Sequence, residues 1–271
     1  RDTDWGLVSV WDDTGSVTDG NGGARNIIAR GAVFTVPAGG IGEAEGVGGG
    51  PVDLQVGTLA ALSQGNQYFI QAPDGRDLTI GTVGDGGEQI NYVMFSPVGV
   101  GSWDIERMSD LESTAGSVKV GVRNGSLTVN DGEPMGPRPE MDGVGVRAAE
   151  DVLLDAWSMN GNVDGDVTLN AAVVSDAGSI SVLAARNIAQ NVSGSAKGDI
   201  LVVSGDGTID IEVAGGAIVM ADGTLGQTDG GHIRYAASGG ITLGLLDART
   251  REARDVAEDG SDNDADSLVD S

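Results

Sequence analysis

The sequence predicts an all-β chain wound as a parallel β-helix, or β-solenoid, with irregular loop inserts. Three observations predict this fold: short phrases of alternating apolar and small or polar residues recur, they return at a roughly constant spacing, and many of the 46 glycines stand at their boundaries. With 271 residues and a hydrophobic fraction of 39%, the chain is long enough and apolar enough to bury a core.

The recurring phrases are clearest in the second half of the chain. Each opens at a glycine or an acidic residue and continues as about five alternating residues, the period of a β-strand. Side chains such as Val167 and Ile209 then face inward, while Thr168 faces water. Glycine suits the corners, where positive φ or close backbone approach is needed. We expect strands in the phrases at 125–129, 165–171, 178–184, 198–203, 207–213 and 240–243.

The spacing of the strands indicates how they stack. Two interleaved strand families each return after roughly 20 residues, as a coiled ribbon would require. This spacing predicts about eleven turns and, at about 4.8 Å per turn, a rod of roughly 50 Å. The apolar residues that begin the first family are Leu127, Val146, Val167, Ile188, Ile209 and Ile233, and those of the second are Ile180, Ile200, Ile218 and Ile241.

The first half shows a looser version of the same pattern, with strand-like segments at 32–36, 52–56, 68–70 and 78–80. We predict an N-terminal segment at 1–23, a solenoid body at 24–248 and an acidic tail at 249–271. Two irregular stretches, near 84–110 and 131–141, are expected as inserts that leave the body, the first with a short helix over 103–111.

Composition excludes several kinds of chemistry. The chain has no cysteine, so disulfides, thiolate metal sites and cysteine nucleophiles are absent, and its one histidine, His232, leaves no multi-histidine metal centre. A formal charge of −26 repels nucleic acid and anionic lipid, and no stretch is long and apolar enough to predict a membrane helix. We therefore expect no nucleic-acid partner and no membrane insertion.

Several phrases resemble the repeats of very large bacterial surface proteins of the filamentous-haemagglutinin-like type. The resemblance covers roughly residues 24–248. It implies a right-handed helix, as the crossover rule also favours, with export to the cell exterior and a role in adhesion, surface architecture or a filament. The phrases that carry it are at 24–29, 40–42, 52–61, 77–83, 165–171, 178–184 and 239–243.

The acidic tail resembles the Asp-rich calcium repeats found between modules of extracellular proteins. Asp262, Asp264, Asp266 and Asp270 stand at positions 1, 3, 5 and 9 of a loop, a spacing that lets alternate carboxylates converge on one Ca²⁺. Ser267 replaces the usual glycine at position 6, and the sequence stops before position 12. A calcium site and a solvated acidic tail both remain open.

Three other groups of residues bear on function. Trp103 and Trp157 are candidate platforms for carbohydrate, although aromatic residues can also cover an edge of a solenoid. Asp210 and Glu212 share an outward face and are the candidate acid–base pair of an enzyme. His232 is expected on the surface.

The expected function is that of a non-catalytic, extracellular structural or adhesive β-solenoid segment of a large surface or filament-forming protein. Because the chain begins with Arg1, we interpret it as a processed product or a piece of a longer protein. The expected partners are copies of itself or flanking modules, head-to-tail, and surface glycans. The alternatives are a polysaccharide-active β-helix enzyme and a carbohydrate-binding module.

Overall fold

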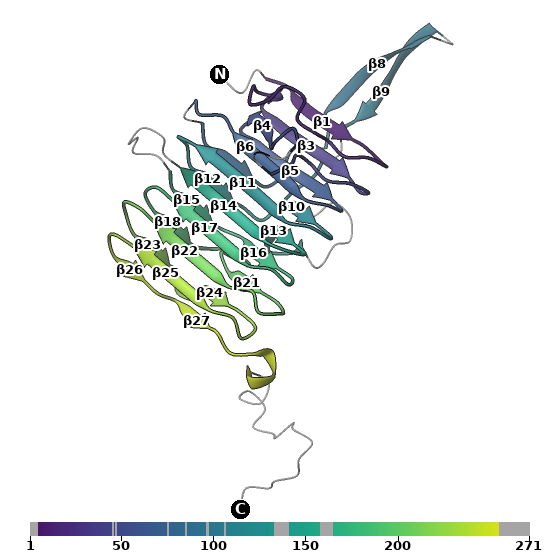
Figure 1. Cartoon of the computed structure of the whole chain (residues 1–271). Helices are drawn as coiled ribbons and strands as arrows, with labels where there is room; N and C mark the ends of the chain where they lie inside the picture. Colours follow the sequence, from purple (N-terminus) through teal and green to yellow (C-terminus); the bar gives the residue numbers. More distant parts are fainter. Residues whose placement is uncertain are drawn as a thin grey trace, which may run out of the picture.

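The computed structural model confirms the parallel β-solenoid. Its strands stack into a large parallel sheet that curls 342° round an axis (Figure 1). Parallel stacking pairs the backbone N–H and C=O groups of each turn with those of the turns before and after it. The described residues are 5–44, 46, 48–74, 76–84, 86–95, 98–105, 107–132, 141–157 and 165–254.

Sheet A is a parallel sheet that forks at one strand. The start of β5 (Thr58–Ser63) pairs with β7, while its end pairs with β10. Before the fork, β1 (Leu7–Trp11) pairs with β3 (Gly31–Val36), and β3 pairs with β5. The first branch is β7 (Leu78–Ile80), β12 (Leu127–Val129), β15 (Val167–Leu169), β18 (Ile188–Gln190), β23 (Ile218–Met220) and β26 (Ile241–Thr242). The second branch is β10 (Leu111–Ser113), β13 (Val144–Ala148), β16 (Ala172–Ser175), β21 (Ile200–Val202), β24 (Leu225–Gln227) and β27 (Leu245–Asp247).

Sheet B forms the remaining face of the solenoid. Its strands follow chain order without exception: β2 (Ile27–Ile28), β4 (Val52–Gln55), β6 (Gln67–Gln71), β11 (Val118–Arg123), β14 (Val152–Trp157), β17 (Ile180–Ala184), β22 (Ile209–Val213) and β25 (Ile233–Ala237). From β10 onward each turn visits the second branch, sheet B and the first branch in that order.

The predicted period of roughly 20 residues holds for only some turns, as where Val167 pairs with Ile188 and Leu225 with Leu245. Each turn from β10 onward contains three strands instead of two: Val118 pairs with Val152, 34 positions on, and Ile209 pairs with Ile233, 24 positions on. The eight strands of sheet B, at about 4.8 Å each, give a stack of roughly 35 Å rather than 50 Å. The first strand family predicted from the spacing takes members from sheet B and from both branches of sheet A, because inserts change the length of the turns.

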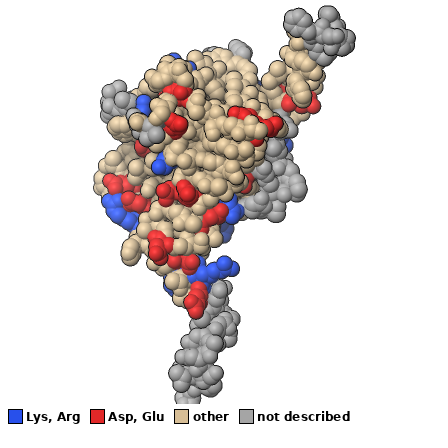
Figure 2. Space-filling model, turned by 45° about the vertical axis from the view of Figure 1, so that its right-hand side comes forward, with Lys and Arg blue, Asp and Glu red and all other residues tan. Residues whose placement is uncertain are grey.

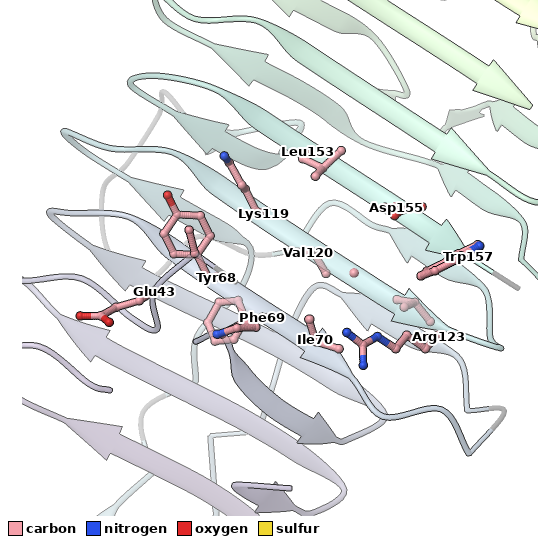
Figure 3. Close-up of a pocket in the computed structure, with 14 residues that line it drawn as sticks. Glu43, Tyr68, Phe69, Ile70, Lys119, Val120, Arg123, Leu153, Asp155 and Trp157 are labelled. Atoms are coloured by element: carbon pink, nitrogen blue, oxygen red, sulfur yellow. The ribbon is translucent and has the colours of Figure 1, made fainter. Parts of the chain in front are cut away.

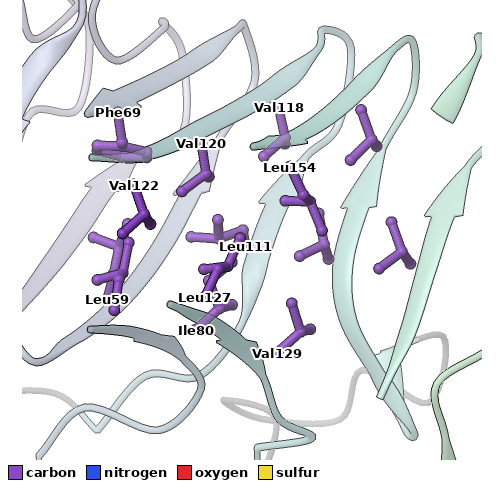
Figure 4. Packing of buried hydrophobic residues seen from close by; sticks show 14 of the residues in the cluster. Leu59, Phe69, Ile80, Leu111, Val118, Val120, Val122, Leu127, Val129 and Leu154 are labelled. Carbon is purple, nitrogen blue, oxygen red and sulfur yellow. The ribbon is translucent and has the colours of Figure 1, made fainter. Parts of the chain in front are cut away.

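The core consists of aliphatic columns that run along the solenoid. In sheet B, Val120, Leu154, Val182 and Ile211 lie opposite one another in successive strands and are fully buried. Figure 4 shows Val120 and Leu154 with buried residues of both branches of sheet A. Val167, Leu169, Ile209 and Ile211 face inward as predicted.

Side-chain amides form hydrogen bonds at two corners of the solenoid. Directly after strands β12, β15 and β18 of the first branch, Asn170 Nδ2 donates to Asn130 Oδ1 (2.8 Å) and Asn191 Nδ2 donates to Asn170 Oδ1 (2.9 Å). Three successive turns therefore share a ladder of asparagines. Inside the core, Gln71 Nε2 donates to Val56 O (2.7 Å), and its Oε1 accepts from Val56 N (3.2 Å). These bonds satisfy polar groups that no strand ladder pairs.

Some connections from the first branch of sheet A to the second are long. Two of them are described excursions, and one is a segment that is described only in part. The first is an antiparallel hairpin, β8 (Gln89–Phe95) and β9 (Val98–Asp104), which projects from the body (Figure 1). The predicted insert near 84–110 is thus a β-hairpin. The helix expected over 103–111 is wrong, because Trp103 and Asp104 end β9 and Leu111 begins β10.

The second insert, near 131–141, joins β12 to β13, and its residues 133–140 lie outside the described residues. Another excursion lies further along the chain, between β18 and β21. It is the small antiparallel pair β19 (Val192–Ser193) and β20 (Ala196–Lys197). Sequence inspection did not single out this pair.

The strands β1 and β27 form the two ends of the stack. The stacked strands begin at Leu7, within the expected N-terminal segment 1–23, and continue to Asp247. A single helical turn follows at 251–254. No helix in the described part of the chain has the length and apolar character needed to cross a membrane.

Candidate binding groove on sheet B

A groove lies on the outer face of sheet B, across β6, β11 and β14. Alternation places Phe69, Val120 and Leu154 in the core, so the residues between them point outward. Backbone pairing then aligns three outward rows across the strands. The rows are Tyr68, Lys119 and Leu153; Ile70, Gly121 and Asp155; and Arg123 with Trp157.

Gly121 creates the hollow at the centre of this grid. A Cβ at this position would meet no atom closer than Ile70 Cγ1, at 3.6 Å, so open space remains where a side chain would stand. The hollow has a volume of about 320 Å³, which is at the lower end of the range for small-ligand sites. Figure 3 shows the surrounding side chains, with Trp157 and Arg123 near one end and Tyr68 and Glu43 toward the other.

Aromatic rings stand at both ends of the groove. Trp157 is 55% exposed, although it belongs to a regular strand. Tyr68 lies beneath Lys119, whose Nζ is 5.5 Å from the ring centroid, a cation–π contact. Burial, with Glu150 and Asp151 nearby, raises the pKa of the Tyr68 hydroxyl, so this group stays protonated and can donate a hydrogen bond.

The charged groups of the groove have few partners within the protein. Among the described residues, Arg123 and Asp155 make no ion pair or side-chain hydrogen bond, and Lys119 makes only the contact with Tyr68. Burial raises the pKa of the Asp155 carboxyl above its usual value. Glu43, at the far end, accepts a hydrogen bond from Gly49 N (2.9 Å).

Most of the other arginines in the described part of the chain are paired with acids. Arg30 contacts Glu88 (2.8 Å) and Arg147 contacts Asp176 (2.8 Å). Figure 2 shows acidic side chains spread over one face rather than gathered in one patch, with basic side chains beside several of them. The unpaired cations of the groove therefore stand out in a strongly acidic chain.

The predicted acid–base pair is located on the same sheet, further along. Arg234 Nη1 donates to both Asp210 Oδ1 (2.7 Å) and Glu212 Oε2 (2.8 Å). Asp210 and Glu212 face outward as predicted, but a shared arginine holds both carboxylates in ion pairs, which favours a structural role. His232 is exposed, also as predicted.

The structure separates the two candidate tryptophans. Trp157 lines the groove, whereas Trp103 lies in β9 of the projecting hairpin, where its ring centroid is 5.7 Å from that of Tyr92. Trp103 is 67% exposed and does not line the hollow. Trp157 is the one that a binding site would use.

The predicted calcium ligands, Asp262, Asp264, Asp266 and Asp270, lie outside the described residues. Within the described part of the chain, no group of three or more His, Asp or Glu side chains is arranged to hold a metal ion. The buried Asp19, in an acidic glycine-rich loop, accepts bonds from Asn21 N, Gly22 N and Asn26 Nδ2. These bonds lower the pKa of Asp19, with the Asn26 bond contributing most.

Sequence inspection missed most of the groove, namely Tyr68, Lys119, Gly121, Arg123 and Asp155. Their only signal is an outward position in three alternating strands. Tyr68 and Lys119 are 51 positions apart, because an insert separates β6 from β11, so spacing could not align them.

Comparison with known proteins adds no relative. A scan against protein-family models finds no match, and searches of curated proteins and of solved structures find none either. The chemistry of the groove is therefore the basis for assigning a function.

Proposed function

We propose that this chain is a non-catalytic, adhesive segment of an extracellular β-solenoid protein, and that it binds carbohydrate in the groove of sheet B. The observation that supports this proposal is a set of polar groups around an apolar hollow that make no ion pair or side-chain hydrogen bond in the described part of the chain. They are the Tyr68 hydroxyl, the Lys119 ammonium, the Arg123 guanidinium, the Asp155 carboxyl and the Trp157 indole N–H, on three paired strands.

A carbohydrate fits these groups by its own chemistry. One face of a sugar ring carries C–H groups that pack on an aromatic face such as Trp157, while its hydroxyls donate and accept hydrogen bonds. Because the groups stand on adjacent strands of a continuous sheet, no backbone segment has to be ordered on binding. An open groove also suits a chain that extends beyond the site in both directions.

The same geometry favours binding over catalysis. Most glycosidases need two carboxylates that flank the scissile bond. In the groove, Asp155 lies beside the hollow, but Glu43 lies toward the opposite end and is bound to Gly49 N. The other acid pair, Asp210 and Glu212, is held by Arg234.

The extracellular location and the link to filamentous-haemagglutinin-like surface proteins belong to the same proposal. The parallel stack supports the solenoid part of this proposal, since its edge strands leave backbone groups open to a further turn. On the last turn Ile241, Leu243 and Leu245 are 42%, 55% and 60% exposed. We expect the partner at this end to be a second copy or a flanking module, stacked head-to-tail.

A glycan array tests the binding proposal. Wild-type protein and the Trp103→Ala variant should bind the same glycans, while Trp157→Ala should lose at least tenfold in affinity, because the stacking surface is gone. Trp157 is half exposed, so the variant should keep the melting temperature of the wild type. If no glycan binds, or if Trp157→Ala binds like the wild type, the proposed function is wrong. Release of new reducing ends from a bound glycan would contradict its non-catalytic part.

A further inference from the structure

We infer that the groove selects sugars that bear a carboxylate, and that Arg123 receives this carboxylate from a ring stacked on Trp157. This inference rests on the proposed function and names its ligand class. The ligand is a short stretch of an acidic polysaccharide, such as a uronate chain.

Arg123 has no acidic partner of its own among the described residues. This is unexpected, because acidic residues outnumber basic ones 41 to 15. Arg25, Arg30, Arg76, Arg147, Arg186, Arg234, Arg249 and Arg254 each lie within 4 Å of an Asp or Glu oxygen. An arginine left half-buried and unpaired at the end of a groove is available to a carboxylate supplied by a ligand.

Arg123 is positioned to contact a sugar ring that stacks on Trp157. The two residues are direct neighbours across β11 and β14, so their backbones are about 4.8 Å apart. A substituent at the edge of a stacked ring therefore falls beside the guanidinium. Its planar fork can donate two parallel hydrogen bonds to a carboxylate, which a hydroxyl cannot accept in the same way.

A second cation extends the site along the groove. Lys119 is four residues before Arg123 on the same strand, a separation of about 13 Å. Gly121 lies between them and leaves the hollow open for the intervening part of the ligand. Two cations at this separation suit a chain with repeated carboxylates rather than a single charged sugar.

The acids near the groove limit which anions fit. Asp155 faces the hollow, Glu43 lies at the far end, and Glu150 and Asp151 lie near Tyr68. With the strong negative charge of the whole chain, they disfavour densely charged polyanions such as nucleic acid. Asp155 can instead accept a hydrogen bond from a sugar hydroxyl, and burial, which raises the pKa of its carboxyl, disfavours the charged form there.

The test uses an array in which each acidic glycan is printed beside its methyl-esterified counterpart. The two ligands differ in the charge of the carboxylate and in little else. Wild-type protein should bind the acid at least tenfold more tightly than the ester, as expected for a charge-assisted hydrogen bond. Arg123→Gln should reduce this preference severalfold, with Lys119 left as the second cation, while it keeps binding to the ester.

Arg251→Gln is the matched control, because Arg251 is exposed, lies beyond β27 and undergoes the same change in charge. It should keep the full preference, and raised salt should weaken binding of the acid but not of the ester. Equal binding of acid and ester, or a preference that Arg123→Gln leaves undiminished, would overturn this inference and leave the proposed function in place. An array without any bound glycan would overturn both.

Discussion

Arg123 lies directly opposite Trp157 in the β11–β14 ladder, and the next backbone N–H, that of Asn124, donates to Trp157 O (2.8 Å). Backbone hydrogen bonds thus fix the end of the groove where the guanidinium and the indole meet. A site held in this way depends on the register of two strands more than on any loop.

Gly121→Val should close the groove without harming the fold. Gly121 has ordinary extended φ, and a Cβ there meets only Ile70 Cγ1 and Phe69 O, at 3.6 and 4.0 Å. Valine also suits a strand better than glycine does, so the melting temperature should stay or rise slightly. Glycan binding should fall at least tenfold, as measured by titration calorimetry. A variant that binds normally would show that the hollow is not the binding site.

Leu154→Ala should destabilise the solenoid strongly, because Leu154 is fully buried in the central column of sheet B. Removal of a buried leucine side chain costs about 2–5 kcal/mol of unfolding free energy. The neighbouring Leu153 points outward, so Leu153→Ala is a matched control that should cost about 1 kcal/mol or less. Urea unfolding of both variants measures the difference. Similar losses would contradict the assigned inward and outward faces of β14.

Asp110 should make stability depend on pH. Its side chain is buried, its Oδ1 accepts from Gly132 N (3.1 Å), and its Oδ2 has no partner among the described residues. Burial raises the pKa of Asp110 to about 7, so between its usual value of 3.8 and pH 7 the folded protein holds a proton that the unfolded chain has released. Stability therefore falls as pH rises through this range.

Asp110→Asn should flatten this part of the pH profile, since asparagine stays neutral and also tolerates the positive φ of 69°. Urea midpoints at pH 4.5, 5.5, 7 and 8 should show the variant gaining on the wild type as pH rises. The comparison isolates Asp110, because all other carboxyls are shared. Parallel profiles for the two proteins would show that Asp110 does not titrate in this range.

Asn170→Ala should weaken the corner between the two branches of sheet A. Asn170 both donates to Asn130 and accepts from Asn191, so its loss breaks two hydrogen bonds. We expect a loss of about 1–2 kcal/mol in unfolding free energy. Ser181→Ala, at an outward position of β17, should cost about 0.5 kcal/mol or less. Equal costs would mean that the ladder contributes little.

Leu245→Lys should reduce self-association through the last turn. Leu245 is 60% exposed at the edge of sheet A, where a second copy would stack. Light scattering should show a mass that rises with concentration for the wild type and stays at the monomer value for the variant. Val93→Lys, on the projecting hairpin, changes an 82% exposed valine and should behave like the wild type. A wild type that stays monomeric at every concentration would argue against stacking of two copies.

The sequence was sufficient to predict the type of fold but not the arrangement of its faces. Alternation identified Val167, Leu169, Ile209 and Ile211 as inward residues, because the period of a strand is local. Turn length is not local: inserts change it, so Ile188 and Ile209 seemed to share a column although they lie in different sheets. The groove could not be predicted for the same reason, because its three strands come from turns of unequal length.

The corner sealed by Asn130, Asn170 and Asn191 is also where the β8–β9 hairpin and the β19–β20 pair leave the body. Segments of very different length are thus accommodated there without a change in the pairing of the three faces. A foreign peptide spliced into this corner should be displayed on one side of the rod, which would make the protein a carrier for grafted epitopes.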